Sequence, residues 1–141
     1  MKITFPVASD DFIQAGEASS KIKRVLKQIG IPSHIIRKVA IATYESEMNI
    51  VIHAYEGELT LCVNADEIKV VAEDKGPGIA DLDLAMQEGY STASEEVRRQ
   101  GFGAGMGLPN IKKSCGELHI NTKVGTGTTV SMHFNLTESE V

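Results

Sequence analysis

The sequence predicts a single α/β (α+β) domain, a two-layer sandwich in which helices cover one face of a mixed, mostly antiparallel sheet. Two stretches with helical periodicity come first, and two pairs of short alternating apolar segments with turn residues between them follow. The 141 residues, of which 42% are hydrophobic and 23% charged, have the size and composition of one globular domain. We therefore expect residues 1–141 to form one domain with about five strands and about three helices.

The N-terminal part of the chain is predicted to be one strand followed by two helices. Residues 2–7 alternate apolar and polar side chains, as a strand with one buried face does. The stretch "SDD" at residues 9–11 predicts an N-cap and an acidic first turn for a helix that ends at Gly30. Ser33 is expected to cap a second helix, which runs to about Ala54.

The rest of the chain predicts two hairpins separated by a helical and loop region. The segments "ELTLCVNA" and "EIKVVAED", at residues 58–74, form the first hairpin, and residues 117–136 form the second, turned by "GTG". Between them, residues 80–89 predict a short helix and residues 107–116 another. Residues from about 89 to 106 lose all periodicity, and so long a loop in a compact domain predicts a lid.

Charge and hydropathy exclude two classes of partner. The formal net charge of −5 and the pI near 5.3 give no basic footprint for nucleic acid. No apolar run approaches the roughly 20 residues of a membrane span, and the N-terminus lacks the apolar core of a signal peptide. We expect a cytoplasmic protein that binds neither nucleic acid nor membrane, with an acidic surface that is compatible with a homodimer.

A stripe of polar residues on the second helix is the first candidate for a site. Glu45, Asn49 and His53 follow one another at intervals of four residues and so share one face. Taken alone, the stripe is equally well explained as the solvent side of an amphipathic helix. Asp74 favours a ligand, because strand alternation points its carboxylate toward the helix layer, where it needs a hydrogen-bond donor such as the exocyclic amine of adenine.

Glycine-rich segments are the second candidate. Gly76 and Gly78 in "DKGPGI" are by themselves more often turn residues than ligand contacts. Glycine at alternate positions directly before a helix at Leu108 indicates a backbone that approaches a phosphate or changes shape, and these positions are Gly101, Gly103, Gly105 and Gly107. The GxxxxGK[ST] phosphate loop and the HRD and DFG sequences of protein kinases do not occur in the chain, so a nucleotide site here belongs to another class.

Four segments in this order resemble the N, G1, G2 and terminal boxes of the GHKL (Bergerat-fold) ATPases: "ESEMNIVIHA", "DKGPGI", "GFGAGMGLPNIK" and "GTGTTV". The resemblance covers about residues 42–130. In its short length and in the segment "DLDLAMQEGYST", the chain is similar to the free-standing serine/threonine kinases of bacterial partner-switching systems. The similarity is greatest to the stressosome switch kinase and next to anti-sigma factors. The resemblance implies a Bergerat ATP-binding fold, a histidine-kinase-like ATPase domain whose ATP lid is the loop at about residues 89–106.

The resemblance also implies ATP and Mg²⁺ as cofactors and assigns roles to single residues. Asn49 would coordinate Mg²⁺, Glu45 would be the general base, and Asp74 would hydrogen-bond the adenine amine. Gly76 and Gly78 would let the backbone pass close to adenine. The phosphates would be wrapped by the glycine run and the helix start, at Gly103, Gly105, Gly107 and Leu108.

Expectations for the two threonines, for Glu47 with the lid insert and for His53 complete this set. Thr128 or Thr129 would support Asp74 through a water molecule. Glu47 departs from the family pattern, since it adds a second acid beside the base, and the lid insert "ASEEVRRQGF" is longer than expected. For His53 the apolar neighbours favour a structural, hydrogen-bonded histidine over a catalytic one.

The function implied by the resemblance is a Mg-ATP-dependent protein serine/threonine kinase that phosphorylates a STAS-domain regulator of the anti-sigma-antagonist type. A sigma factor and a PP2C-type phosphatase are further candidate partners. The alternative is an ATP-gated interaction module, either an anti-sigma factor or a phosphatase activator, in which phosphotransfer is incidental. In a third reading the glycines are only turns of an α/β domain.

Overall fold

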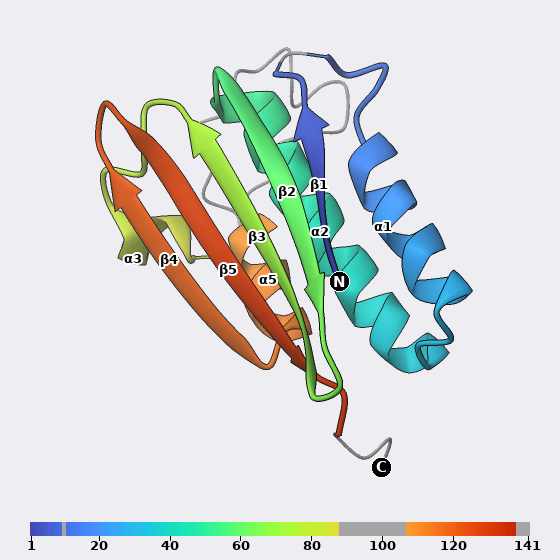
Figure 1. Cartoon of the computed structure of the whole chain (residues 1–141). Helices are drawn as coiled ribbons and strands as arrows, with labels where there is room; N and C mark the ends of the chain where they lie inside the picture. Colours follow the sequence, from blue (N-terminus) through green and yellow to red (C-terminus); the bar gives the residue numbers. More distant parts are fainter. Residues whose placement is uncertain (10, 88–106, 138–141) are drawn as a thin grey trace.

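A computed structural model describes residues 1–9, 11–87 and 107–137 (Figure 1). The strands are β1 (Lys2–Val7), β2 (Glu56–Val63), β3 (Glu67–Lys75), β4 (Glu117–Lys123) and β5 (Gly127–Asn135). The helices are α1 (Glu17–Gln28), α2 (Ser33–His53), α3 (Leu82–Ala85) and α5 (Gly107–Ser114).

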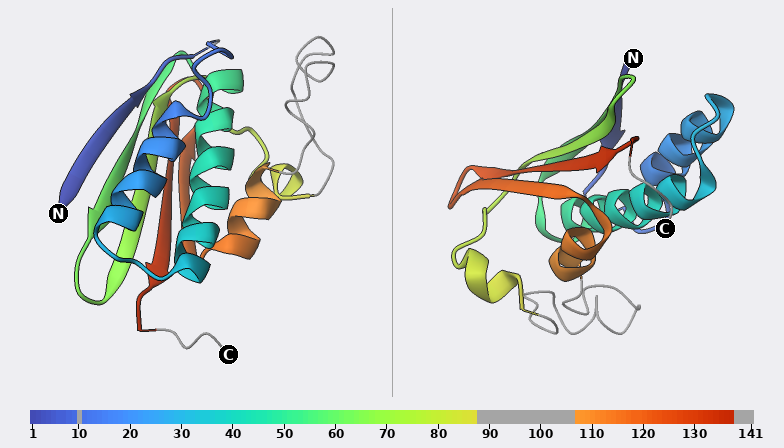
Figure 2. Two further views of the ribbon diagram at one scale, coloured as in Figure 1. Left: turned by 90° about the vertical axis from the view of Figure 1, so that its right-hand side faces the viewer. Right: turned by 90° about the horizontal axis from the view of Figure 1, so that it is seen from below.

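The five strands form one sheet in the order β1-β2-β3-β5-β4. All four neighbouring pairs are antiparallel, so the described sheet contains none of the parallel pairing that a mixed sheet would have. Helices α1, α2 and α5 cover one face, and the opposite face carries no described helix (Figure 2). The predicted two-layer architecture is therefore confirmed.

The core lies between the two layers and follows the predicted alternation. Inward-facing residues of β2, β3 and β5 meet the apolar stripes of α1, α2 and α5, and the fully buried side chains include Ile22, Leu26, Val39, Leu59, Leu61, Ile68, Val70, Ile111 and Met132. Helix α2, with 21 residues, is the longest described helix and contributes ten buried residues. Among the described helices, none has both the length and the apolar composition needed to cross a bilayer.

Two predicted helix starts are wrong. Helix α1 begins at Glu17 rather than at "SDD", because Gly16 has a φ of 95° and interrupts the helical backbone there. The Asp11 carboxylate instead accepts the Gln14 N–H at 3.1 Å within a turn. Ser33 does not cap α2, since the carbonyl of Pro32 already accepts helical hydrogen bonds and Ser33 is the first helical residue.

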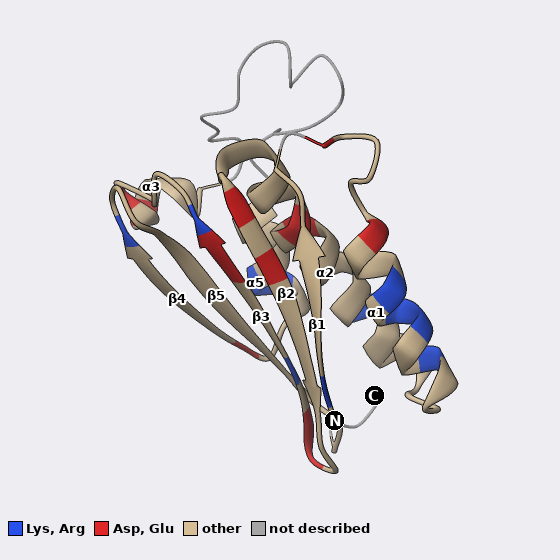
Figure 3. Cartoon of the chain, turned by 45° about the horizontal axis from the view of Figure 1, so that its top comes forward, with Lys and Arg blue, Asp and Glu red and all other residues tan. Residues whose placement is uncertain are grey.

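The net charge of −5 is unevenly distributed over this fold. Figure 3 shows basic residues gathered on α1 and acidic residues on β2 and β3. The sequence of α1 accounts for the basic group, which consists of Lys21, Lys23, Arg24 and Lys27. The acidic protein thus presents a basic helix, α1, at the edge of its helical layer.

Candidate functional site

The polar stripe of α2 lies against the start of α5. Gly107, the first residue of α5, is packed so closely that a Cβ atom built on it would lie 3.2 Å from Asn49 Oδ1 and 3.5 Å from Glu45 Oε2. Both side chains are half-buried. The stripe is therefore more than the solvent side of an amphipathic helix. Because position 107 is a glycine, no side chain there covers the amide oxygen of Asn49 or the carboxylate oxygen of Glu45.

Asn110 is a member of this site that the sequence reasoning missed. Its Nδ2 donates a hydrogen bond of 3.1 Å to Glu45 Oε1, across 65 residues of sequence. The bond fixes one carboxylate oxygen, while the other lies beside Gly107. The available signal was spacing, because a residue three positions after Gly107 shares its face of the helix.

Asp74 lies near the end of β3, where it pairs with Thr128 of β5. The Thr128 N–H donates to Asp74 Oδ1 at 3.2 Å. Gly76 comes close to the end of α2, since a Cβ on it would lie 3.0 Å from Ala54 Cα and 3.3 Å from Asp74 Oδ1. Thr129 pairs with Glu73 and so points to the other face of the sheet, which leaves Thr128 as the partner of Asp74.

Burial controls the electrostatics of Asp74. Desolvation raises the pKa of its carboxyl above the ordinary aspartate value, and the hydrogen bond from the Thr128 N–H opposes that shift. A further donor on the carboxylate, such as an amine, would stabilise the charged form. Burial also lowers the pKa of His53, which favours the neutral imidazole.

Asp74→Asn should remove an electrostatic cost without removing the hydrogen bond, because an amide oxygen also accepts the Thr128 N–H. In the wild type the folded state binds more protons than the unfolded state as pH rises from the ordinary aspartate pKa through the raised one, so stability falls across this window. Urea unfolding of both proteins from about pH 4 to pH 7 measures the difference. The variant should gain stability relative to wild type as pH rises, and a relative loss would contradict the assignment.

The loop after Asp74 is held against the turn between β4 and β5. Gly78 has a φ of 74°, and a Cβ there would collide with the carbonyl of Lys123. The Gly125 N–H donates to the Pro77 carbonyl at 2.8 Å, and the Ile79 N–H donates to Thr122 Oγ1 at 2.9 Å. Packing alone thus requires glycine at position 78, while the approach of Gly76 and Gly78 to adenine stays a prediction.

Glu47 does not belong to this site. Two helical positions separate it from Glu45, so it projects from a different face of α2 and is 2% exposed. Its carboxylate accepts three backbone N–H groups at the start of α1, from Gly16 at 2.9 Å, Ala18 at 3.2 Å and Ser19 at 2.8 Å. The interpretation of Glu47 as a second acid beside the base is therefore wrong, because this carboxylate caps a neighbouring helix.

The remaining predicted residues divide into two groups. The Leu108 side chain is buried in the core, and its backbone lies in the first turn of α5, where helix N–H groups lack helical partners. Gly103, Gly105 and the predicted lid at about residues 89–106 lie outside the described residues.

The groups at the start of α5 fit a magnesium-bound phosphate. Amide and carboxylate oxygens, here those of Asn49 and Glu45, are ligands that Mg²⁺ accepts. The N-terminal end of α5 offers N–H groups and a positive dipole end to an anion. The amide and carboxylate side chains, the glycine that leaves them uncovered and the helix start therefore combine the chemistry that a nucleotide phosphate with its metal requires.

Comparison with known proteins agrees with this fit. Residues 8–134 match the histidine kinase-like ATPase domain family. The chain is 31% identical over 112 residues to the serine/threonine-protein kinase RsbT of Bacillus subtilis (strain 168), a match that covers 77% of this chain and 78% of the relative. It is also 31% identical over 102 residues to the anti-sigma F factor of Thermoanaerobacter sp. (strain X514), covering 69% of this chain and 68% of that relative.

Solved structures share the fold. The RsbU and RsbW domains of Rv1364c from Mycobacterium tuberculosis superpose with a TM-score of 0.64 at 14% identity, covering 95% of this chain and 32% of that chain. The mycobacterial sensor histidine kinase MprB superposes with a TM-score of 0.55 at 16% identity, covering 94% of this chain and 97% of that chain. At these identities the likeness concerns the fold alone.

Proposed function

Because the chain belongs to the histidine kinase-like ATPase family, we propose that it is a Mg-ATP-dependent protein serine/threonine kinase of a bacterial partner-switching system. The observation that carries the proposal is the meeting of Glu45 and Asn49 at the first residue of α5. A carboxylate and a metal-binding amide side by side at a helix N-terminus combine a proton acceptor with charge neutralisation. These are the main requirements of phosphoryl transfer.

Each residue of the site has a separate task in this proposal. When bound, Mg-ATP supplies the γ-phosphoryl group and the charge that balances it. Asn49 would hold the metal through its side-chain oxygen, and Asp74 would accept a hydrogen bond from the adenine amine. Glu45 takes the proton of the attacking hydroxyl, and Asn110 orients Glu45 by its hydrogen bond of 3.1 Å. The backbone N–H groups of Gly107 and Leu108, in the first turn of α5, would contact the phosphates.

The proposed substrate is a serine or threonine of a STAS-domain regulator. Its support is the similarity to a relative named as a serine/threonine-protein kinase and to others named as anti-sigma F factors. A sigma factor and a PP2C-type phosphatase remain further candidate partners, and the cytoplasm is the proposed compartment.

A second candidate function is an ATP-gated interaction module. The similarity to anti-sigma F factors favours it, with 32% identity over 102 residues to the factor of Caldanaerobacter subterraneus. In this function nucleotide sets the shape of the binding surface, and partner capture differs between ATP and ADP while no partner is phosphorylated.

Labelling separates the two functions. Purified protein and Mg-ATP labelled on the γ-phosphate are added to a lysate of the host, with Asp74→Asn as a folded variant that should not bind adenine. Label on serine or threonine of a small protein, present with wild type and absent with the variant, would support the kinase. If wild-type protein binds ATP but labels no protein, the interaction module is favoured. Pull-downs in the presence of ATP and of ADP would then follow.

A further inference from the structure

We propose that the sheet face opposite the helices carries a binding site for a divalent transition-metal ion of the zinc class, formed by Glu117, His119 and His133. The site is independent of the nucleotide site, because it is built from the outward side chains of β4 and β5. Glu67 of β3 supports it. Imidazole ligands favour Zn²⁺, Ni²⁺ or Cu²⁺ over Mg²⁺ and Ca²⁺, so the two sites would take different metals.

Strand register brings the three ligands together. Glu117 of β4 stands directly opposite His133 of β5, and His119 lies two residues along on the same face of β4. One ligand atom from each residue lies within 4.8 Å of the others. Two ligands of a tetrahedral zinc ion are about 3.4 Å apart, so small side-chain rotations bring these atoms to coordination distance.

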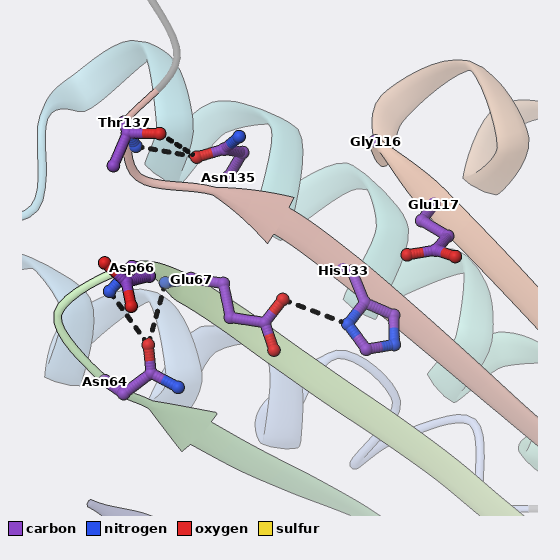
Figure 4. A pocket seen from close by; sticks show the side chains of 8 residues that line it. All are labelled: Asn64, Asp66, Glu67, Gly116, Glu117, His133, Asn135 and Thr137. Carbon is purple, nitrogen blue, oxygen red and sulfur yellow. Dashed lines mark hydrogen bonds and ion pairs between the residues drawn. The ribbon is translucent and has the colours of Figure 1, made fainter.

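Hydrogen bonds already orient the two imidazoles. The Nδ1 of His133 lies 3.2 Å from Glu67 Oε2, which leaves Nε2 of the same ring available (Figure 4). Metal-binding histidines usually make this contact between the second ring nitrogen and a carboxylate. Glu117 Oε1 lies 2.9 Å from His119 Nε2, so a ligand oxygen and a ligand nitrogen are already adjacent. The ring centroids of His119 and His133 are 5.8 Å apart, with the planes near perpendicular.

A pocket gives access to this cluster. Its lining includes two of the three ligands, Glu117 and His133, together with the supporting Glu67 (Figure 4). Further oxygen-bearing side chains come from the β2–β3 turn and from the end of β5 and the residues after it: Asn64, Asp66, Asn135 and Thr137. Three protein ligands leave a fourth coordination position for water. The Lys69 side chain opposes the cation, because Lys69 pairs with His133 from β3. Glu67 and Glu117 offset that charge.

A bound ion would join β4 to β5 directly and to β3 through Glu67. An ion that binds only the folded state stabilises it by RT ln(1 + L/Kd), where L is the free metal concentration, so the unfolding temperature should rise with metal concentration. Glu45 and Asn49 lie on α2, and Asp74 points toward the helical layer, so all three are on the other side of the sheet. Metal at the outer face should therefore leave ATP binding unchanged.

Titration of tag-free, metal-free protein with Co²⁺ and Zn²⁺ tests the proposal, in excess Mg²⁺ so that oxygen-only sites are occupied. We expect one Co²⁺ per chain with a visible spectrum of nitrogen coordination, displaced by Zn²⁺, and a rise in unfolding temperature. His119→Ala and His133→Ala should each abolish the spectrum, and Glu67→Gln should weaken affinity by about 10–100-fold.

The matched control is His34→Ala, which removes a histidine of α2 outside the cluster and should bind as wild type does. Circular dichroism of the four variants verifies that each is folded. Saturable Co²⁺ binding that survives His119→Ala and His133→Ala would overturn the site, and so would the absence of saturable binding to wild type. Equal weakening by His34→Ala would also overturn it.

Discussion

Glu47→Ala is expected to lower the free energy of unfolding by about 3–5 kcal/mol, because it leaves three backbone N–H donors at the start of α1 without their carboxylate acceptor. Three backbone N–H groups at the start of α1 lose the carboxylate that accepts their hydrogen bonds, and Glu47 is 2% exposed. Water replaces that acceptor poorly in a buried position, so each donor left unpaired costs about 1–3 kcal/mol. Urea unfolding followed by circular dichroism measures the loss.

The control for this prediction is two residues away. Glu45→Ala removes the same number of atoms from the same helix, but from a half-buried position with one side-chain partner. It should cost less than about 1.5 kcal/mol. Glu47→Gln distinguishes charge from shape, because it keeps one oxygen acceptor and places an NH₂ donor against N–H donors. Equal stabilities of the Glu45 and Glu47 alanine variants would contradict the capping role.

Glu45→Gln is expected to reduce phosphotransfer by about 10²–10⁴-fold while ATP affinity stays unchanged. Glutamine keeps the size of the side chain and an oxygen for Asn110, but it cannot take a proton from a hydroxyl. The rate of label transfer from γ-labelled Mg-ATP to the substrate found in the lysate, at saturating ATP, measures the effect. Affinity for ATP is measured separately by calorimetry.

Glu47→Gln is not a suitable control for this experiment, since it is expected to destabilise the fold. Glu73→Gln serves instead, because it removes a carboxylate from an exposed position on the outer face of β3. That variant should transfer phosphate at the wild-type rate. Full activity of Glu45→Gln would remove Glu45 from the mechanism, whereas loss of activity together with loss of ATP binding would assign it to nucleotide binding.

The periodicity of hydrophobic residues and the positions of turn residues were sufficient to predict most of the fold. The two hairpins place Leu59, Leu61, Ile68 and Val70 inward as alternation requires, and α2 ends at His53, within one residue of its expected end. The predicted start of α1 was wrong because the N–H groups at its N-terminus donate to a residue far along the chain rather than to a local cap. A local signal cannot report such a partner.

The candidate site was predicted in part. Glu45 and Asn49 share one face of α2 as their spacing indicated, and both lie beside Gly107, a residue that the family resemblance assigned to the phosphates. The place of Asn110 in the site and the capping role of Glu47 depend on which helices pack against each other. Spacing along the sequence does not contain that information. The outer cluster was missed for the same reason, since Glu67 and His133 are 66 residues apart and meet only through strand register.

The dependence of α1 on Glu47 has a consequence for synthesis on the ribosome. The N-cap residue Gly16 has no side chain to satisfy the free N–H groups of α1, and their acceptor is about 30 residues downstream. A chain that emerges N-terminus first therefore exposes the 12-residue α1 segment without its cap, and too short to form a stable helix alone, until α2 has left the exit tunnel. Glu47 reaches the start of α1 only when the two helices dock, which places the ordering of α1 after the formation of α2.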